Sequence, residues 1–203
     1  MNENNILGVV LAGGKSKRFG KDKSGIKLGG KTLLEHTLDK IKSKFTTIII
    51  VSNNKIIKDY ITIKDCMEGH LGPLVGVLSA MKWIKKNNYS YKWIATFPCD
   101  TPFFNIDLID KFIEATKLND SLLYFIKSKE KRHNIFGLWS LKLIETLEKD
   151  IIENNHRKVE QWANKIGVKT INIPYDNIDP FFNINTKEDL AEAEKILIKY
   201  KND

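Results

Sequence analysis

The residues best suited to bind and neutralise a negatively charged group lie between positions 8 and 36, in the sequence GVVLAGGKSKRFGKDKSGIKLGGKTLLEH. Residues 15–31 of this segment include six lysines and one arginine, and Asp22 is the only acid among them. A concentrated group of cations can neutralise the oxygens of a triphosphate and of the pyrophosphate that leaves it. Arg18 and Lys23 stand just beyond a pair of glycines, and we expect them to meet phosphate groups.

The glycine pair, Gly13 and Gly14, follows an apolar run, but it fits neither of two common phosphate loops. A Walker loop places lysine directly after its second glycine, and here Gly14 stands between Gly13 and Lys15. A dinucleotide fingerprint needs a spacing of glycines that Gly13, Gly14 and Gly20 do not supply. Residues 9–12 instead predict a buried strand that ends at Gly13, where the glycines let a ligand approach the backbone closely.

Asp100 is the second candidate for chemistry, and it follows another apolar run in the sequence FPCDTPFF. Pro98 and Pro102 favour an extended or turned backbone around it. A carboxylate at a strand end beside a phosphate-binding segment suits Mg²⁺, which prefers one or two carboxylates together with substrate phosphates. The alternative is that Asp100 only caps the turn or the following helix. Asp65 and Asp107 are weaker candidates for the same role.

The histidine, serine and cysteine residues show no pattern typical of a nucleophilic catalytic site or of a metal site. No serine stands on a nucleophile elbow, and no metal-ligand spacing links the histidines His36, His70, His133 and His156. Residues 156–158 and His133 could contact a second anionic substrate, and a solvated charged turn is the alternative. Cys66 and Cys99 fit neither a disulfide framework nor a zinc spacing, so we expect both to be free and buried in a reducing cytoplasm.

The elements that must position these residues are predicted by the apolar pattern. Six apolar runs bounded by turns indicate strands, and helical spacing between most of them indicates an α/β sheet. The six runs are ILGVVLA, TTIIIVS, KWIATF, SLLYFI, NIFGLW and VKTINI. Ligands bind at the carboxyl ends of the strands in open α/β sheets. We therefore expect the glycine–lysine segment, residues 52–55 (SNNK) and residues 98–104 (PCDTPFF) to meet at one edge.

Three helices should flank this sheet. Residues 31–45 place Leu34, Leu38, Ile41 and Phe45 on one helical face, which predicts a helix packed through that stripe. Residues 72–86 repeat the pattern after a Gly-Pro turn. Thr186 stands three positions before Asp189, a capping-box-like arrangement that predicts the start of a final helix.

Length and charge narrow the class of protein. The 203 residues suit one domain spanning 1–203, because no long polar or low-complexity stretch divides them. No apolar run approaches membrane-spanning length and no leader pattern opens the chain, so we expect a cytoplasmic protein without a membrane partner. A net charge of +8 and a pI near 9.3 would allow a nucleic-acid partner. The chain has no aromatic–basic or helix-turn-helix pattern, so we expect no nucleic acid.

Four sequence blocks together resemble the molybdenum cofactor guanylyltransferases, within the Rossmann-like nucleotidyltransferase superfamily. They are residues 8–41, LGPLVGVLSAM, FPCDTPFF and FFNINTKEDL. The first block alone identifies only the superfamily, whereas PCDTPF and NINT point to the molybdopterin branch. The resemblance implies a three-layer α/β/α domain with a mostly parallel mixed sheet that uses GTP and Mg²⁺. It also implies transfer of GMP from GTP to molybdopterin-form molybdenum cofactor, with the guanine dinucleotide cofactor and pyrophosphate as products.

The resemblance further implies which residues bind the nucleotide. Arg18 and Lys23 would neutralise the triphosphate. Asp65 would contact the guanosine end, because a carboxylate can accept the paired N–H donors of guanine. Asn53 would be a further nucleotide contact. The nucleotide would also lie against the backbones of four successive residues, Leu11, Ala12, Gly13 and Gly14.

For the metal and the second substrate, the resemblance implies that Asp100 binds Mg²⁺ and that the pterin faces four polar residues, Arg157, Lys158, Asn183 and Asn185. The sequence departs from the family pattern at two positions. Asn134 stands where family members often have proline, in a segment expected to face the pterin, and Lys187 replaces the usual proline in the first turn of the last helix. Proline there only preorganises the backbone, so the second change should cost little.

Several functions remain open at the level of sequence. A sister enzyme could use CTP with the same pterin, or a nucleotidyltransferase could act on another small phosphorylated acceptor. A non-catalytic nucleotide-binding protein that delivers cofactor belongs to a different class. The cationic segment together with Asp100 favours catalysis, because a pure binder does not need a metal carboxylate. Protein partners would be other cofactor-biosynthesis proteins or the molybdoenzymes that accept the product.

Overall fold

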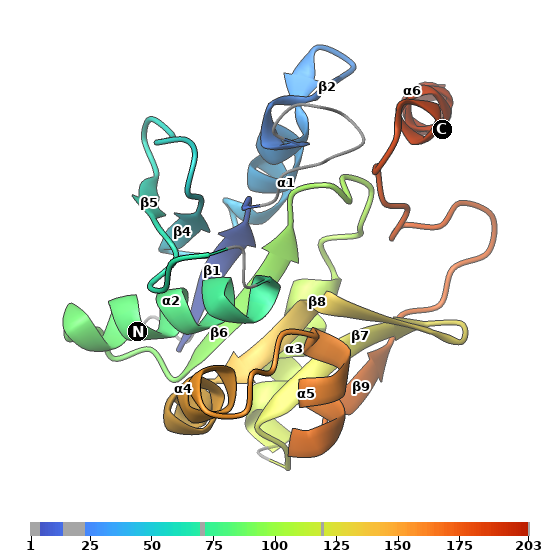
Figure 1. The fold of residues 1–203 in the computed structure, drawn as a ribbon. Helices are drawn as coiled ribbons and strands as arrows, with labels where there is room; N and C mark the ends of the chain where they lie inside the picture. Colours follow the sequence, from blue (N-terminus) through green and yellow to red (C-terminus); the bar gives the residue numbers. More distant parts are fainter. Residues whose placement is uncertain (1–4, 14–22, 70–71, 119, 203) are drawn as a thin grey trace.

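Within residues 5–13, 23–69, 72–118 and 120–202, which the computed structural model describes, the chain forms a seven-stranded sheet (Figure 1). In spatial order its strands are β5 (Ile61–Ile63), β4 (Ile48–Val51), β1 (Ile6–Leu11), β6 (Trp93–Pro98), β8 (Lys131–Ser140), β7 (Leu123–Ser128) and β9 (Lys169–Asn172). Strand β8 is antiparallel to both neighbours, and the other pairs are parallel. This confirms the predicted mostly parallel mixed sheet. Of the predicted site residues, Gly14 and Arg18 lie outside the described ranges, and so does the side chain of Lys23.

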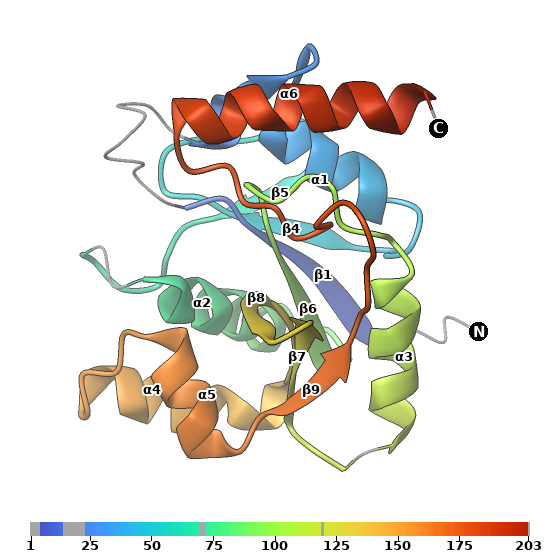
Figure 2. The ribbon, with the colours of Figure 1, turned by 90° about the vertical axis from the view of Figure 1, so that its right-hand side faces the viewer.

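Three layers form because side chains of β1 alternate between two cores. Ile6 and Val10 belong to one buried cluster, and Leu7 and Val9 belong to the other. The first cluster is completed by α1 (Leu33–Ile41) and α3 (Leu108–Leu118). The second is completed by α2 (Pro73–Lys86), η2 (Leu141–Leu143), α4 (Ile144–Ile152) and α5 (Val159–Ile166). The two sets of helices lie on opposite faces of the sheet in Figure 2, as the predicted α/β/α architecture requires.

Helix α1 has the predicted apolar face but is shorter than predicted. A capping box begins it, in which the Thr32 hydroxyl accepts a hydrogen bond from the Glu35 N–H and the Glu35 carboxylate accepts one from the Thr32 N–H. The helix ends at Ile41, and a turn over residues 42–44 follows it. Phe45, directly after this turn, is buried. A Cβ on Gly8 would lie 3.0 Å from the Phe45 ring. The helix therefore ends before Phe45, and the Phe45 ring packs against β1 at Gly8, where no side chain is in the way.

The chain ends in helix α6 (Lys187–Asn202), which packs on a short hairpin far away in sequence. The hairpin consists of β2 (Lys27–Leu28) and β3 (Lys31–Thr32), and it follows the 3-10 helix η1 (Lys23–Gly25). Their shared core is formed by Leu28, Leu33, Phe103, Ile184, Ala193 and Ile196. The predicted start of α6 is confirmed, because the Asp189 N–H donates to the Thr186 hydroxyl at 3.1 Å and the Asp189 carboxylate accepts from the Thr186 N–H at 2.9 Å.

Among the described residues, no helix is long and apolar enough to cross a membrane.

Candidate active site

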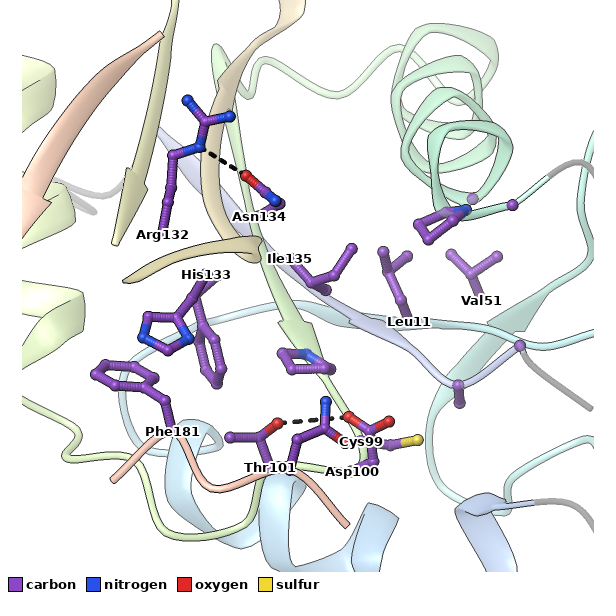
Figure 3. Close-up of a pocket in the computed structure, with 18 of the residues that line it drawn as sticks. Leu11, Val51, Cys99, Asp100, Thr101, Arg132, His133, Asn134, Ile135 and Phe181 are labelled. Atoms are coloured by element: carbon purple, nitrogen blue, oxygen red, sulfur yellow. Dashed lines mark hydrogen bonds between the residues drawn. The ribbon is translucent and has the colours of Figure 1, made fainter. Parts of the chain in front are cut away.

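A pocket of about 460 Å³ opens at the carboxyl ends of β1, β4 and β6 and beside the first half of β8 (Figure 3). A cavity of this size can hold much of a nucleotide-sized ligand. Its lining includes three residues from the end of β1, namely Leu11, Ala12 and Gly13, together with Asp65, Asp100 and Asn183. The structure therefore brings together two of the three predicted loops, the glycine–lysine segment and residues 98–104, whereas no residue of 52–55 lines the pocket.

One end of the pocket is formed by β1 and the start of α2. The Ala12 N–H donates to the Val51 carbonyl at 3.0 Å, so the pairing with β4 continues to the pocket edge. Gly72 has a φ of 84°, and Pro73 begins α2 immediately after it. Gly72, Pro73 and Gly76 line the pocket, so the N-terminal end of α2 faces the cavity. The partial positive charge of a helix N-terminus suits an anionic ligand there.

Asp65 at this end is fixed by Asn53. The Asn53 amide donates to Asp65 Oδ2 at 2.7 Å, and the Asp65 N–H donates to Asn53 Oδ1 at 2.9 Å. Asp65 Oδ1 lies 3.7 Å from where a Cβ on Gly76 would be, so its second oxygen is directed across the first turn of α2. Asp65 lines the pocket, whereas Asn53 holds it and is not itself part of the lining. The structure thus pairs the two predicted nucleotide contacts.

Asp100 lies two positions beyond the end of β6, in the pocket wall. Its side chain is partly exposed, and the Thr101 hydroxyl is 3.4 Å from Asp100 Oδ1 (Figure 3). Its carbonyl accepts a hydrogen bond from the Ile184 N–H at 2.8 Å, which joins the PCDTPF and NINT segments. Asp107, the weaker metal candidate, is exposed and lies outside the pocket, where its carboxylate accepts from the Asn105 amide at 3.0 Å.

The four predicted pterin residues have different positions. Asn183 lines the pocket. Asn185 does not line it, and its N–H donates to the Asp189 carboxylate at 2.8 Å. Arg157 also lies outside the lining, and its guanidinium donates to the carbonyls of Ile151 and His156 at 2.8 and 2.9 Å. It therefore holds the carboxyl end of α4. Lys158 precedes α5 as its N-cap and is exposed outside the lining.

Comparison with known proteins shows which family the chain belongs to. The model of the MobA-like NTP transferase domain matches residues 8–166. The chain belongs to this family. A relative from Rhizobium johnstonii named molybdenum cofactor guanylyltransferase is 34% identical over 202 residues, covering 97% of this chain and 95% of its own. A relative of the same name from Nitrobacter hamburgensis is 31% identical, with 93% of each chain covered.

The fold comparison agrees with this assignment to the MobA-like family. A crystal structure of molybdopterin-guanine dinucleotide biosynthesis protein A from Archaeoglobus fulgidus superposes with a TM-score of 0.75 at 20% identity. The match covers 95% of this chain and 99% of that one. The Rossmann-like nucleotidyltransferase fold that the sequence predicted is therefore confirmed.

The other end of this MobA-like pocket is built by a bulge in β8 that the sequence did not predict. On β7, Phe125 pairs with Gly137 and the next residue, Ile126, pairs with His133. Within these two described strands, residues 134–136 of β8 are thus left without a partner on β7, and all three line the pocket. The Thr96 hydroxyl donates to the Ile135 carbonyl at 2.6 Å and anchors the bulge to β6. Bulges of this kind redirect side chains beside functional sites.

Gly137 permits the strand to return to the sheet after the bulge. A Cβ at this position would lie 2.7 Å from the Phe125 ring and 2.6 Å from the indole nitrogen of Trp139. The Trp139 indole N–H donates to the Thr96 hydroxyl at 2.8 Å, so the surrounding side chains are fixed. The bulge therefore depends on a residue without a side chain at position 137.

His133 and Arg132 begin this part of the wall; His133 was considered as a contact for a second anionic substrate, whereas Arg132 was not among the predicted residues. His133 is buried, its Nε2 is 2.6 Å from the Ser128 hydroxyl, and its ring stacks on Phe181 at 4.2 Å. Burial lowers the pKa of His133 to about 4, and the nearby charge of Lys131 adds to this effect, so the ring is neutral at neutral pH. The basic residues at positions 131–132, just before an apolar run, are the sequence signal that could have identified this wall.

The two cysteines differ from each other. Both are free, as predicted, but only Cys99 is buried, where it lines the pocket beside Asp100. Cys66 is exposed, so the prediction of a buried thiol was wrong there. It follows Asp65 in the loop beyond β5, and the Ser79 hydroxyl accepts a hydrogen bond from its N–H at 2.8 Å. The backbone of Cys66 is thus tied to α2, whereas its side chain points to solvent.

Proposed function

We infer that this protein transfers GMP from GTP to molybdopterin-form molybdenum cofactor, which gives the guanine dinucleotide cofactor and pyrophosphate. The observation that carries this proposal is the alignment with relatives named molybdenum cofactor guanylyltransferase over 93% or more of this chain. That alignment includes the segments that form both ends of the pocket. A pocket with a helix N-terminus at one end and a separate polar wall at the other suits a nucleotide and an acceptor.

The chemistry of the acceptor determines which protein groups are needed. Its nucleophile is a phosphate monoester, whose second pKa is near 6, so it is largely dianionic at neutral pH and requires no general base. In-line attack on the α-phosphorus forms the new phosphoanhydride bond and breaks the bond to pyrophosphate. Catalysis is then mainly positioning and charge compensation. In this proposal Arg18 and Lys23 compensate the triphosphate charge, and the backbone of residues 11–14 lies against the nucleotide.

Asp65 is the residue that we propose recognises the guanine base. Its Oδ1 is directed over Gly76, and its other oxygen is engaged by Asn53. A carboxylate fixed in this way is ready to accept the adjacent N–H groups of guanine, whereas the corresponding edge of cytosine presents an acceptor beside a single donor group. This geometry supports GTP over CTP as the nucleotide.

Asp100 is the proposed ligand for Mg²⁺. Its carboxylate stands at a strand end on the pocket wall, where Thr101 and the backbone contact with Ile184 hold it. Among the described residues no group of three or more acidic, histidine or cysteine side chains could hold a metal by itself. One carboxylate supplemented by substrate phosphates is a usual Mg²⁺ environment, so the residues present fit that ion. When bound, the ion would compensate charge on the phosphate oxygens.

The test measures pyrophosphate release by the purified protein with Mg²⁺ and molybdopterin-form cofactor, and compares GTP with CTP and ATP. We expect turnover with GTP. Asp100→Asn should reduce turnover at least about 100-fold, the usual effect of removing one electrostatic stabiliser. Asp110→Asn is the matched control, because Asp110 is an exposed carboxylate on α3 that pairs with Lys44. Turnover only with CTP, or none with any nucleotide, would contradict the proposal.

A further inference from the structure

Arg132 lines the pocket from β8, two positions before the bulge. Its side chain is only 20% exposed, because three neighbours hold it. Its Nε–H donates to Asn134 Oδ1 at 2.8 Å, and its Nη1 donates to Asn164 Oδ1 at 2.8 Å. Its Nη2 is 3.8 Å from the Glu160 carboxylate. The orientation of the guanidinium is thus set by β8 on one side and by α5 on the other.

These contacts leave part of the guanidinium available for a ligand. A guanidinium has five N–H groups, and the hydrogen bonds to Asn134 and Asn164 engage one on Nε and one on Nη1. The Glu160 carboxylate, 3.8 Å from Nη2, forms an ion pair that is too long for a hydrogen bond. Within the described residues, these contacts therefore leave N–H groups on both terminal nitrogens, and such a rigid planar group matches adjacent oxygen or nitrogen acceptors on a planar ligand. Because its neighbours fix the side chain, it loses little conformational freedom on binding.

The position of Arg132 indicates which part of a ligand it meets. Arg132 and Asp100 lie on opposite sides of the pocket, with His133 and Ile135 between them (Figure 3). If Asp100 marks the reacting phosphates, as proposed above, the acceptor's phosphate lies near it. The opposite end of the acceptor then extends beneath the bulge.

We propose that Arg132 is a specificity-determining residue that binds the pterin end of the acceptor, and that Asn134 and Asn164 position it. This inference rests on the proposed function for the identity of the acceptor. A pterin carries a ring carbonyl and ring nitrogens in one plane, which are acceptors that a guanidinium can engage in pairs.

A purely structural role makes a different prediction. In that case Arg132 only joins β8 to α5, and its replacement lowers stability without affecting substrate binding. The planar side chain also lies over Phe125, with Cζ 5.9 Å from the ring centroid, so some loss of stability is expected in either case. Stability alone does not distinguish the two roles, whereas the KM of each substrate does.

The test compares Arg132→Lys with the wild-type protein in the pyrophosphate-release assay, with the acceptor and GTP varied separately. Lysine keeps the charge and removes the planar pair of donors. We expect the acceptor KM to rise about 10- to 100-fold, the effect of losing a hydrogen bond from a charged donor. The KM of GTP should change less than about twofold. Lys127→Gln is the matched control, because Lys127 is a charged residue on the neighbouring strand that pairs with Glu130 outside the pocket lining.

The positioning role has its own readout. Asn134→Ala should raise the acceptor KM less than Arg132→Lys does, and the double variant should resemble Arg132→Lys alone, because the two residues act through one contact. Additive effects would overturn the role of Asn134. Wild-type turnover combined with an unchanged acceptor KM in Arg132→Lys would overturn the role of Arg132 and leave the proposed function intact. Absence of wild-type turnover, with no quenching of pterin fluorescence on mixing with molybdopterin, would overturn both.

Discussion

Protonation of His133 should destabilise the fold as the pH falls. The ring is 9% exposed, stacked on Phe181 and within hydrogen-bonding distance of the Ser128 hydroxyl. Burial in this environment disfavours the charged imidazolium, and with the nearby charge of Lys131 it lowers the pKa of His133 from 6.5 to about 4. In the unfolded chain the same histidine titrates near its ordinary value. At pH values between these two pKa values, the unfolded state therefore binds a proton that the folded state does not bind.

The sign and size of the effect follow from this difference. Between about pH 6.5 and pH 4 the unfolded state carries more protons, so the free energy of unfolding decreases as the pH is lowered. A difference of about 2.5 pKa units corresponds to about 3 kcal/mol when the decrease is complete. By about pH 5 roughly 2 kcal/mol should already be lost, before most carboxylates are protonated.

Urea denaturation at several pH values between about 7 and 5 tests this reasoning in the wild-type protein and in His133→Gln. Glutamine keeps a polar group near Ser128 but takes up no proton, so the variant should lose about 2 kcal/mol less than the wild type over this interval. The difference between the two curves removes the contributions of other titrating groups. Parallel curves for the two proteins would refute the proposed protonation of His133.

Three further outcomes are expected. Gly137→Ala should reduce the free energy of unfolding by about 1–3 kcal/mol, because the new Cβ overlaps the Phe125 ring, and an unchanged urea midpoint would contradict this. Asp150→Ala should cost about 2–3 kcal/mol, because buried Asp150 accepts the Trp162 indole N–H at 2.9 Å and a donor would be left without its partner. A melting temperature equal to that of the wild type would argue against it. Asp65→Asn should weaken GTP binding about 10-fold or more in a thermal-shift titration, whereas an unchanged GTP-dependent shift would remove Asp65 from guanine recognition.

Much of the fold could be predicted because its signals are local. The apolar runs at residues 6–11 and 93–98 predict buried strands without knowledge of the strands that pair with them. A Gly-Pro turn before an amphipathic run predicts α2. The position of the pocket also follows, since parallel strands bring their carboxyl ends to one edge. Asp65 and Asp100 therefore line one cavity, as their places after strands suggested.

The resemblance led us to expect the segment around Asn134 to face the pterin, but the bulge in β8 and the anchoring of Arg132 could not be predicted, because they depend on contacts between distant residues. The bulge in β8 exists only in relation to the register of β7, and Arg132 is held partly by Asn164, 32 positions away in sequence. No local pattern encodes either relation. The predicted helix over residues 31–45 was too long for a similar reason, because its apolar period continues to Phe45 whereas packing against Gly8 favours a turn.

The unpaired residues 134–136 also determine which changes in chain length this sheet can absorb. Deleting a residue from a regular strand shifts every later side chain to the opposite face. The ladder on one side of the bulge is fixed by the pairing of Ile126 with His133, and on the other by that of Phe125 with Gly137. An insertion or deletion between these two pairs leaves both registers unchanged. The length and shape of this wall of the pocket can therefore change by whole residues, while β1, β4 and β6 at the other end keep their alignment.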